Sequence, residues 1–244
     1  MKTLVLALSF LTTIPLFPVG YVSDEEMGQS SAFFPLVGFV VGGINATMYF
    51  LGLYFWSPAV AAWLWLIANA LITGGLHLDG WMDTFDALGS RKSQSEMLAI
   101  MKDSRIGAMG GMAVVLLLGF KWSLLVAAGA TPALVLLAPV VGRSAVLIAT
   151  QVFTYIRAGG LGHTFTQPLP PARWLFVLVS ILLPLSVLGS MQGLLAALLA
   201  VSLAMLWARS LCHKFGGLTG DTYGAINEAT EVLFLFFALA RFAP

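Results

Sequence analysis

Charged residues are scarce in this sequence. Only 9% of its 244 residues are Asp, Glu, Lys or Arg, whereas 59% are hydrophobic and the mean hydropathy is +0.93. A soluble domain carries charges on about a quarter of its residues, so the composition excludes an ordinary soluble protein and predicts an integral membrane protein. The apolar residues form continuous runs and do not alternate with polar ones, which excludes an outer-membrane β-barrel.

Cysteine and histidine are also rare. The one cysteine, Cys212, excludes an intramolecular disulfide framework and a cysteine-based zinc site. The three histidines are scattered, the net charge is only +1, and the basic residues form no stripe. Nucleic acid is therefore not an expected partner.

Apolar runs divide the chain. A membrane-spanning helix takes about 20 apolar residues, which leaves room for about six to eight. We therefore predict an all-α, polytopic helical bundle that forms a single membrane-embedded catalytic domain over residues 1–244. The first run lacks a small-x-small cleavage site and is broken by Pro15 and Pro18, so we expect it to be retained. The runs cover approximately residues 3–17, 32–56, 59–76, 107–128, 132–153, 174–189, 191–208 and 232–243.

The connections between the runs are of two kinds. The long ones contain eight of the twelve basic residues and all eleven acidic residues, whereas the short ones contain none. If each run crosses the membrane once, all long connections lie on one side, which the positive-inside rule predicts to be cytoplasmic. Carboxylates gathered at one face indicate a chemical function there. The long connections are 18–31, 77–106, 154–173 and 209–231, and the short ones are 56–58, 129–131 and 189–191.

The first cluster of candidate residues is GGLHLDGWMDTFDAL, residues 74–88. Asp79, Asp83 and Asp86 are spaced i, i+4 and i+7, which places them within roughly 60° of one another on a helix. Carboxylates this close repel one another, and a divalent cation such as Mg²⁺, which takes oxygen ligands and bridges carboxylates to phosphates, would offset the repulsion. The alternative is a solvated acidic face. His77 is a candidate substrate-binding residue or a satisfied polar side chain.

The second cluster is MKDSRIGAMG, residues 101–110. It adds a fourth carboxylate, Asp103, and two cations, Lys102 and Arg105. Cations neutralise phosphate oxygens, and arginine does so with two hydrogen bonds. The alternative is a cytoplasmic loop that obeys the positive-inside rule.

The third cluster is GGLTGDTYGAINEATE, residues 216–231, where Gly and Thr before Asp221 predict a turn into a helix. Glu228 and Glu231 enter an apolar run, where ionisable groups are costly and indicate function. Arg143, in the middle of another run, should face a partner or a water-filled cavity. Lys121 is interpreted as a side chain that snorkels.

Glycines indicate close contacts between helices. Gly38, Gly42 and Gly43 follow Phe33-Phe34-Pro35 and predict close helix packing.

GGLHLDGWMDTFDAL followed by MKDSRIGAMG resembles the central signature of the adenosylcobinamide-GDP ribazoletransferases, also called cobalamin synthases. LSFLTTIPL, FFPLVGFVVGG, VGRSAVL and GGLTGDTYGAINEATE are similar to other recurrent segments of this family, in the expected order across nearly the whole chain. The resemblance implies a late step of vitamin B12 assembly. Such an enzyme is Mg²⁺-dependent and lies in a bacterial or archaeal inner membrane. It joins adenosylcobinamide-GDP to α-ribazole or its 5′-phosphate and releases GMP.

The clusters and the resemblance together give a hypothesis for the site. Carboxylates would hold one or two Mg²⁺ on the diphosphate and cations would neutralise its oxygens. One carboxylate would act as general base, with Asp86 as the candidate. The predicted metal ligands are Asp79, Asp83, Asp86 and Asp103. The predicted catalytic residues are Asp83, Asp86, Lys102 and Arg105. The predicted substrate-binding residues are His77, Arg143, Asp221, Asn227, Glu228 and Glu231.

Two other functions remain open at this point. CDP-alcohol phosphotransferases also place aspartates around metals on membrane helices, although their Asp-x-x-Asp-Gly-x-x-Ala-Arg spacing is not matched. An ion-coupled transporter would use buried carboxylates as an ion path. Against it, the acidic residues gather at one face, and no paired half-helix repeat is visible. The lipid bilayer is an expected partner, and a homo-oligomer is left open.

Overall fold

The computed structural model describes residues 2–16, 20–127, 131–157, 161–188 and 190–240. Within these ranges the chain is helical and contains no named β-strand, which confirms the predicted all-α class. The elements are α1 (Lys2–Leu11), α2 (Asp24–Ser30), the short 3₁₀ helix η1 (Ser31–Phe33), α3 (Phe34–Phe55), α4 (Pro58–Thr73), α5 (Leu76–Ser90), α6 (Gln94–Ile100), α7 (Ala108–Ala127), α8 (Pro132–Val152), α9 (Leu161–Thr164), α10 (Pro171–Leu188), α11 (Met191–Phe215) and α12 (Gly220–Leu239).

The polytopic prediction is also confirmed. Among the described residues, five helical segments are long and apolar enough to cross a membrane, and α4 with α5 makes a sixth if that bent pair counts as one span. Six is the lower end of the predicted number. The central helix α12 has a suitable length but carries three carboxylates, and α1 is too short to count. The five segments are Asp24–Phe55, Ala108–Ala127, Ala133–Val152, Pro171–Leu188 and Met191–Phe215.

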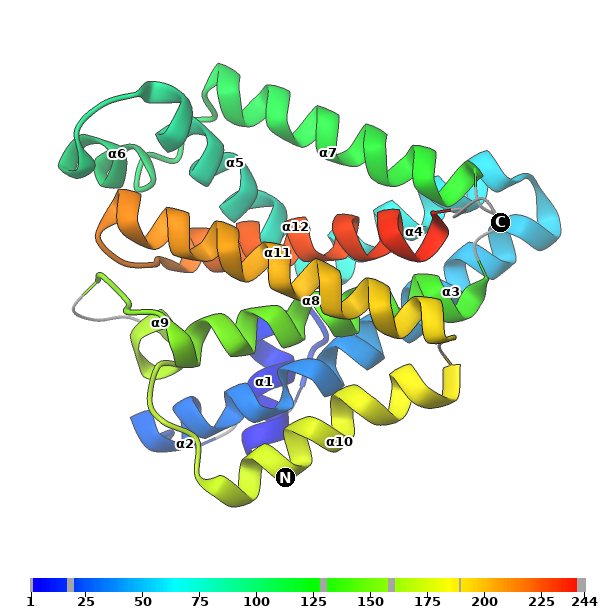
Figure 1. Ribbon diagram of the computed structural model, residues 1–244, viewed down its shortest axis with the longest axis horizontal. Coiled ribbons are helices and arrows are strands. Elements are labelled where there is room, and N and C mark those ends of the chain that lie inside the picture. Colours follow the sequence, from blue (N-terminus) through cyan, green and yellow to red (C-terminus); the bar gives the residue numbers. More distant parts are fainter. Residues whose placement is uncertain (1, 17–19, 128–130, 158–160, 189, 241–244) are drawn as a thin grey trace.

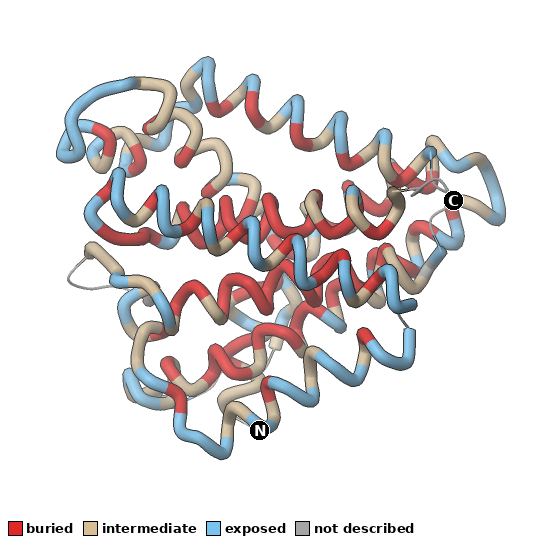
Figure 2. Tube along the Cα trace, viewed as in Figure 1, coloured by how far each residue is buried: buried red, intermediate tan, exposed pale blue. Residues whose placement is uncertain are grey.

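The helices form a bundle around α8 and α12 (Figure 1). α12 packs against α5, α8 and α11, while α8 also packs against α3. α7 borders one side of the bundle and α10 the other (Figure 1). The burial pattern in Figure 2 follows this order, because α8 and α12 are buried along most of their length whereas α7 and α10 are exposed on their outer faces.

The polar connections gather at one end of the bundle. α2, α6, α9 and the turn from α11 to α12 lie at the left in Figure 1, and the turn from α3 to α4 lies at the opposite end. This agrees with the predicted placement of the long connections. The short turn at 56–58 is confirmed, and Ser57 Oγ there accepts a hydrogen bond from Val60 N (3.4 Å) at the start of α4. Of the predicted turns at 129–131 and 189–191, residues 129, 130 and 189 lie outside the described residues, whereas Thr131 and Ser190 are the N-cap residues of α8 and α11.

The predicted bounds of the last connection and the last helix are wrong. Residues 209–231 are mostly helical, because α11 ends and α12 begins within them, separated by four residues. Thr219 caps α12: its Oγ1 accepts a hydrogen bond from Thr222 N (3.2 Å), and Thr222 Oγ1 accepts one from Thr219 N (2.8 Å). α12 therefore begins twelve residues before the predicted run 232–243, whose last three residues lie outside the described ranges.

Two glycines produce the sharp bend between α4 and α5. Gly74 and Gly75 have φ angles of 61° and 73°, in the left-handed region that glycine adopts without a steric penalty. α5 consequently turns by 91° relative to α4. The bend directs the aspartates of α5 along the polar end of the bundle instead of continuing the apolar run of α4.

α3 and α8 approach closely at two glycines. A Cβ added to Gly38 would lie 2.5 Å from the Pro139 carbonyl oxygen, and one added to Gly42 would overlap the Leu136 carbonyl oxygen. The prediction of close packing is thus confirmed at these two positions. Gly43 differs, because a Cβ there would meet no atom within 4 Å.

A proline inside α8 frees a backbone acceptor, which a neighbouring helix satisfies. Pro139 has no N–H, so the carbonyl of Val135 lacks its usual helical donor. The indole Nε1 of the buried Trp65 on α4 donates a hydrogen bond to this carbonyl (3.1 Å). Within a bilayer such a group has no water to bond, so this contact ties α4 to α8.

The two neighbouring glycines of α3 give a matched test of the packing. We expect Gly42→Ala to lower the free energy of unfolding by about 1–3 kcal/mol, because the added methyl overlaps the backbone of α8. Gly43→Ala should be neutral or stabilising by about 0.5–1 kcal/mol, since alanine favours the helix and meets no neighbour. Thermal unfolding of both variants in the same detergent measures the difference. Equal melting temperatures would contradict the α3–α8 contact.

Candidate active site

A cavity of about 340 Å³ opens where the first turns of α5 and α12 meet the segment after α8. Its walls combine polar side chains at one part with aromatic and aliphatic side chains at another. The polar residues are His77, Asp79, Thr150, Tyr155, Arg157, Asp221 and Tyr223. The apolar ones include Phe10, Leu11, Phe34, Leu76, Val146 and Phe165.

Asp221 and Arg157 form an ion pair at this cavity. Arg157 Nη2 donates to Asp221 Oδ2 at 2.7 Å, and both side chains are partly exposed. The backbone positions the arginine, because Leu218 N donates to Thr154 O (2.8 Å) and Ile156 N donates to Leu218 O (3.0 Å). The segment that carries Arg157 therefore runs directly beside the cap of α12.

Small residues bring α5 and α12 into backbone contact. A Cβ on Gly80 would lie 2.5 Å from the Asp221 carbonyl oxygen, and one on Gly224 would lie 3.2 Å from His77 Cα. This contact places Asp79 and Asp221, from two helices, on the wall of one cavity. Asp79 also lines a second cavity of about 550 Å³ on the other side of the first turn of α5.

His77 and Tyr155 are two further polar residues that line the cavity. His77 is buried and lines the cavity, and its Nδ1 has no hydrogen-bond partner among the described residues. Burial raises the pKa of the Tyr155 phenol, which therefore stays neutral. Its ring stacks on Tyr223, with 5.9 Å between the ring centroids. Both residues thus offer neutral polar atoms to a ligand.

Asp86 has a structural role that was not predicted. Its Oδ2 accepts a hydrogen bond from Gly107 N (2.8 Å), and its Oδ1 accepts one from Gly110 N (2.7 Å). These amides belong to the start of α7, where free N–H groups and the helix dipole favour a carboxylate. Asp86 thus caps α7 and does not line either cavity, and its roles as metal ligand and general base stay predictions.

The predicted residues of the 101–107 segment do not line either cavity. Arg105 and Asp103 instead form an exposed pair, with 2.6 Å between Arg105 Nη2 and Asp103 Oδ2. The hydrogen bonds from Arg105 hold the pKa of Asp103 at about 2. Lys102 is exposed. The exposed pair and the exposed lysine are what a polar cytoplasmic loop would show, which was the alternative to a catalytic segment. The catalytic role of these residues stays a prediction.

Four charged side chains are buried together among α7, α8 and α12. Lys121 Nζ lies 2.6 Å from Glu228 Oε2 and 2.8 Å from Glu231 Oε2. Arg143 Nη1 lies 2.8 Å from Glu231 Oε1. None of the four is more than 1% exposed. We call these residues the buried ion cluster.

The buried ion cluster confirms that Arg143 faces a charged partner and corrects the interpretation of Lys121. Arg143 faces a charged partner, as expected, but it does not line the cavity. Lys121 does not snorkel, because two carboxylates neutralise it inside the bundle. Glu228 and Glu231 satisfy these cations and are not at the cavity wall, and Asn227 Nδ2 donates to Glu231 (3.1 Å). The structure places these residues away from the cavity, and their role in substrate binding stays a prediction.

Sequence reasoning missed several residues of the site. Arg157, Tyr155 and Tyr223 line the cavity but were not predicted as site residues. Arg157 was visible only as one of the basic residues in the connection 154–173. Nothing in its spacing indicated that this connection pairs with Leu218 beside α12.

The carboxylates at the cavity suit a magnesium ion better than a metal with a full protein cage. Among the described residues, no three His, Cys, Asp or Glu side chains form a group that could hold a metal. Mg²⁺ is usually bound by one or two carboxylates together with water and phosphate oxygens. Asp79 and Asp221, which line the same cavity, supply such a pair.

Comparison with known proteins identifies one family. The sequence model described as cobalamin-5-phosphate synthase matches residues 3–239. A curated adenosylcobinamide-GDP ribazoletransferase from Desulfitobacterium hafniense is 39% identical over 100% of this chain and 99% of its own. The enzyme of that name from Roseiflexus sp. is 40% identical over 94% of this chain and 86% of its own. No solved structure matches significantly.

The buried ion cluster makes a prediction about paired substitutions. Lys121→Met leaves two carboxylates facing one arginine, and we expect it to lower the free energy of unfolding by about 3–5 kcal/mol. Adding Glu228→Gln restores the charge balance, because Arg143 still neutralises Glu231. The double variant should therefore be more stable than Lys121→Met alone. Thermal unfolding of both single variants and the double variant gives a double-mutant cycle. If the losses in the free energy of unfolding simply add, the charges of Lys121 and Glu228 are not coupled and the prediction is wrong.

A second prediction tests whether Asp86 caps α7 or takes part in the reaction. Asp86→Ala removes the acceptor of two N–H groups of α7, so we expect a loss of about 0.5–2 kcal/mol in the free energy of unfolding. Turnover per folded molecule should stay close to that of the unsubstituted chain. The two readouts are thermal unfolding and activity normalised to folded protein. An unchanged melting temperature with lost activity would return Asp86 to a chemical role.

Proposed function

This chain belongs to the cobalamin-5-phosphate synthase family, and we propose that its cavity at the start of α5 and α12 carries the family's transfer reaction. The chain is an adenosylcobinamide-GDP ribazoletransferase, a membrane enzyme of cobalamin biosynthesis. The match of the family model to residues 3–239 is the observation that supports this function most strongly. The lipid-alcohol transferase and the transporter are not favoured.

The reaction transfers the cobinamide-bearing phosphoryl group from GMP to an alcohol. A hydroxyl of α-ribazole, or of its 5′-phosphate, attacks the phosphorus that bears cobinamide. The bond from this phosphorus to the oxygen shared with the guanosine phosphate breaks, GMP leaves, and the hydroxyl loses its proton. Such a reaction needs positioning and charge neutralisation more than covalent chemistry by the protein.

Asp79, Asp83 and Asp221 are the carboxylates that we assign to this chemistry. Asp79 and Asp221 line the cavity and would hold Mg²⁺, which supplies neutralising charge to the diphosphate when bound. Asp83 lies one turn along α5 from Asp79, outside the lining of both cavities, and has no cation within ion-pair distance among the described residues. We assign to it the proton of the attacking hydroxyl.

We assign substrate binding to Arg157 and to the aromatic residues of the cavity. Arg157 already contacts Asp221 and presents further N–H donors, which suit a phosphate oxygen. Phe165 lies 4.7 Å from Phe10 and 5.1 Å from Phe34, measured between ring centroids. These rings suit the planar base of α-ribazole, because flat apolar surfaces stack on aromatic faces.

We place the reaction at the cytoplasmic face of the cytoplasmic membrane. The basic residues of the long connections support this, because positively charged connections remain in the cytoplasm. The cavity is lined by the start of α12 and by the segment after α8, and both lie at the same end of the bundle as these connections (Figure 1).

The carboxylate assignment predicts a loss of turnover without a loss of folding. In lipid-reconstituted protein given adenosylcobinamide-GDP and α-ribazole phosphate, Mg²⁺ should support GMP release and EDTA should abolish it. Asp79→Asn and Asp83→Asn should each reduce release by at least about 100-fold. Asp24→Asn is a matched control, because Asp24 is an exposed carboxylate on α2 away from the cavity.

The outcomes distinguish the parts of the proposal. Full activity in Asp79→Asn or Asp83→Asn would overturn that residue's assignment but leave the transfer reaction in place. Release that is insensitive to EDTA would exclude the magnesium site. No release from folded protein under any condition would overturn the function itself.

A further inference from the structure

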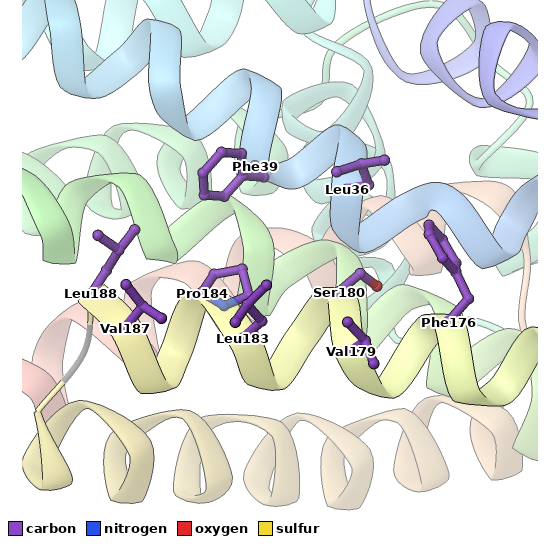
Figure 3. Close-up of a pocket in the computed structure, with 9 residues that line it drawn as sticks. All are labelled: Leu36, Phe39, Phe176, Val179, Ser180, Leu183, Pro184, Val187 and Leu188. Atoms are coloured by element: carbon purple, nitrogen blue, oxygen red, sulfur yellow. The ribbon is translucent and has the colours of Figure 1, made fainter.

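An apolar groove runs along the outside of the bundle between α3 and α10. Figure 3 shows Leu36 and Phe39 of α3 facing a row of α10 side chains from Phe176 to Leu188. The groove has a volume of about 460 Å³. It is separate from the cavity assigned to the reaction, and its nine lining residues are not shared with that cavity.

The groove offers its occupant only hydrocarbon. Ser180 is the one lining residue with a polar side chain, and its hydroxyl donates to Val177 O (2.9 Å) within α10. A group that needs hydrogen bonds would therefore lose them on entering. An apolar chain enters without such a cost.

The surroundings of the groove are lipid. Both walls belong to segments long and apolar enough to span a membrane, and only 11% of the α10 span is buried against the bundle. Several outward side chains of α10 are aliphatic and at least half exposed, among them Leu175, Leu178 and Leu182. The groove therefore opens to the acyl chains of the bilayer.

A cation lies at one end of the groove. The Arg173 guanidinium lies 5.4 Å from the ring centroid of Phe33, and this ring lies 4.8 Å from that of Phe176, which lines the groove. Among the described residues its guanidinium donates one hydrogen bond, to the neutral Gln29 at 3.4 Å. Among the described residues no carboxylate lies within ion-pair distance of Arg173. The guanidinium thus keeps N–H donors for an anion.

We propose that an anionic phospholipid binds here, with one acyl chain in the groove and its phosphate on Arg173. A single such molecule has both groups that this surface can bind: a long hydrocarbon chain for the groove and an adjacent oxyanion for Arg173. A second copy of the protein would have to bring an apolar strip and a free carboxylate to the same positions. The lipid would fill the space that α10 leaves and fix this helix against α3.

Lipid retention in native mass spectrometry tests the headgroup contact. Full-length protein in detergent is titrated with phosphatidylglycerol or phosphatidylcholine. We expect one retained phosphatidylglycerol that binds about tenfold more tightly than phosphatidylcholine, because the choline cation of the second lipid offsets its phosphate charge and repels Arg173. Arg173→Gln should remove this preference. Arg209→Gln, which changes an exposed arginine on α11, should retain it.

A second pair of variants tests the acyl chain. Ser180→Phe places a ring in the groove and should weaken retention of both lipids. Leu182→Phe adds a ring on α10 outside the groove and should not. Equal retention of the two lipids together with no effect of Arg173→Gln would overturn the proposal. So would a dimer whose cross-links map to α3 and α10.

Discussion

The buried ion cluster is the constraint on which the rest of the structure depends. Lys121, Arg143, Glu228 and Glu231 come from three helices and are buried inside the bundle. A charge left alone there is costly, whereas pairing offsets the cost only when the geometry is right. The pairs therefore hold α12 at one rotation and one height against α7 and α8. Because Asp221 belongs to the same rigid helix, the cluster also determines where this carboxylate meets the cavity.

Close backbone contacts with α12 also determine the position of α5, and α5 in turn contacts α7. Gly80 and Gly224 let α5 and α12 touch, so that Asp79 and Asp221 share a wall although they are far apart in sequence. The bend at Gly74 and Gly75 turns α5 toward the polar end of the bundle. Asp86 then fixes the far end of α5 to the start of α7. The site is thus built from helix ends that packing holds in place, which suits a reaction that depends on positioning.

The sequence predicted those features that depend on composition or on local spacing. The membrane class, the polar end of the bundle, the helix with aspartates and the turn before Asp221 are such features. It did not predict features that depend on tertiary partners. The i, i+7 spacing of Asp79 and Asp86 puts both on one face of α5, yet only the position of α7 decides that Asp86 becomes a cap. Similarly, Lys121 had no visible partner along the chain, because Glu228 lies 107 residues later.

This distinction explains why an excess of carboxylates at one face overstated the size of the site. Glu228 and Glu231 neutralise buried cations, Asp86 accepts two backbone N–H groups, and Asp103 pairs with an exposed arginine. Each is occupied by a partner that the fold supplies. Asp79 at the cavity has no such cation among the described residues, and Asp221 shares one that itself lines the cavity. Asp83 lies one turn from Asp79, outside the cavity lining, and also has no such cation among the described residues. A carboxylate that lines a cavity and has no protein cation beside it gains the most free energy from binding an external cation or a proton. The acidic residues with the fewest contacts are therefore the ones most suited to the chemistry.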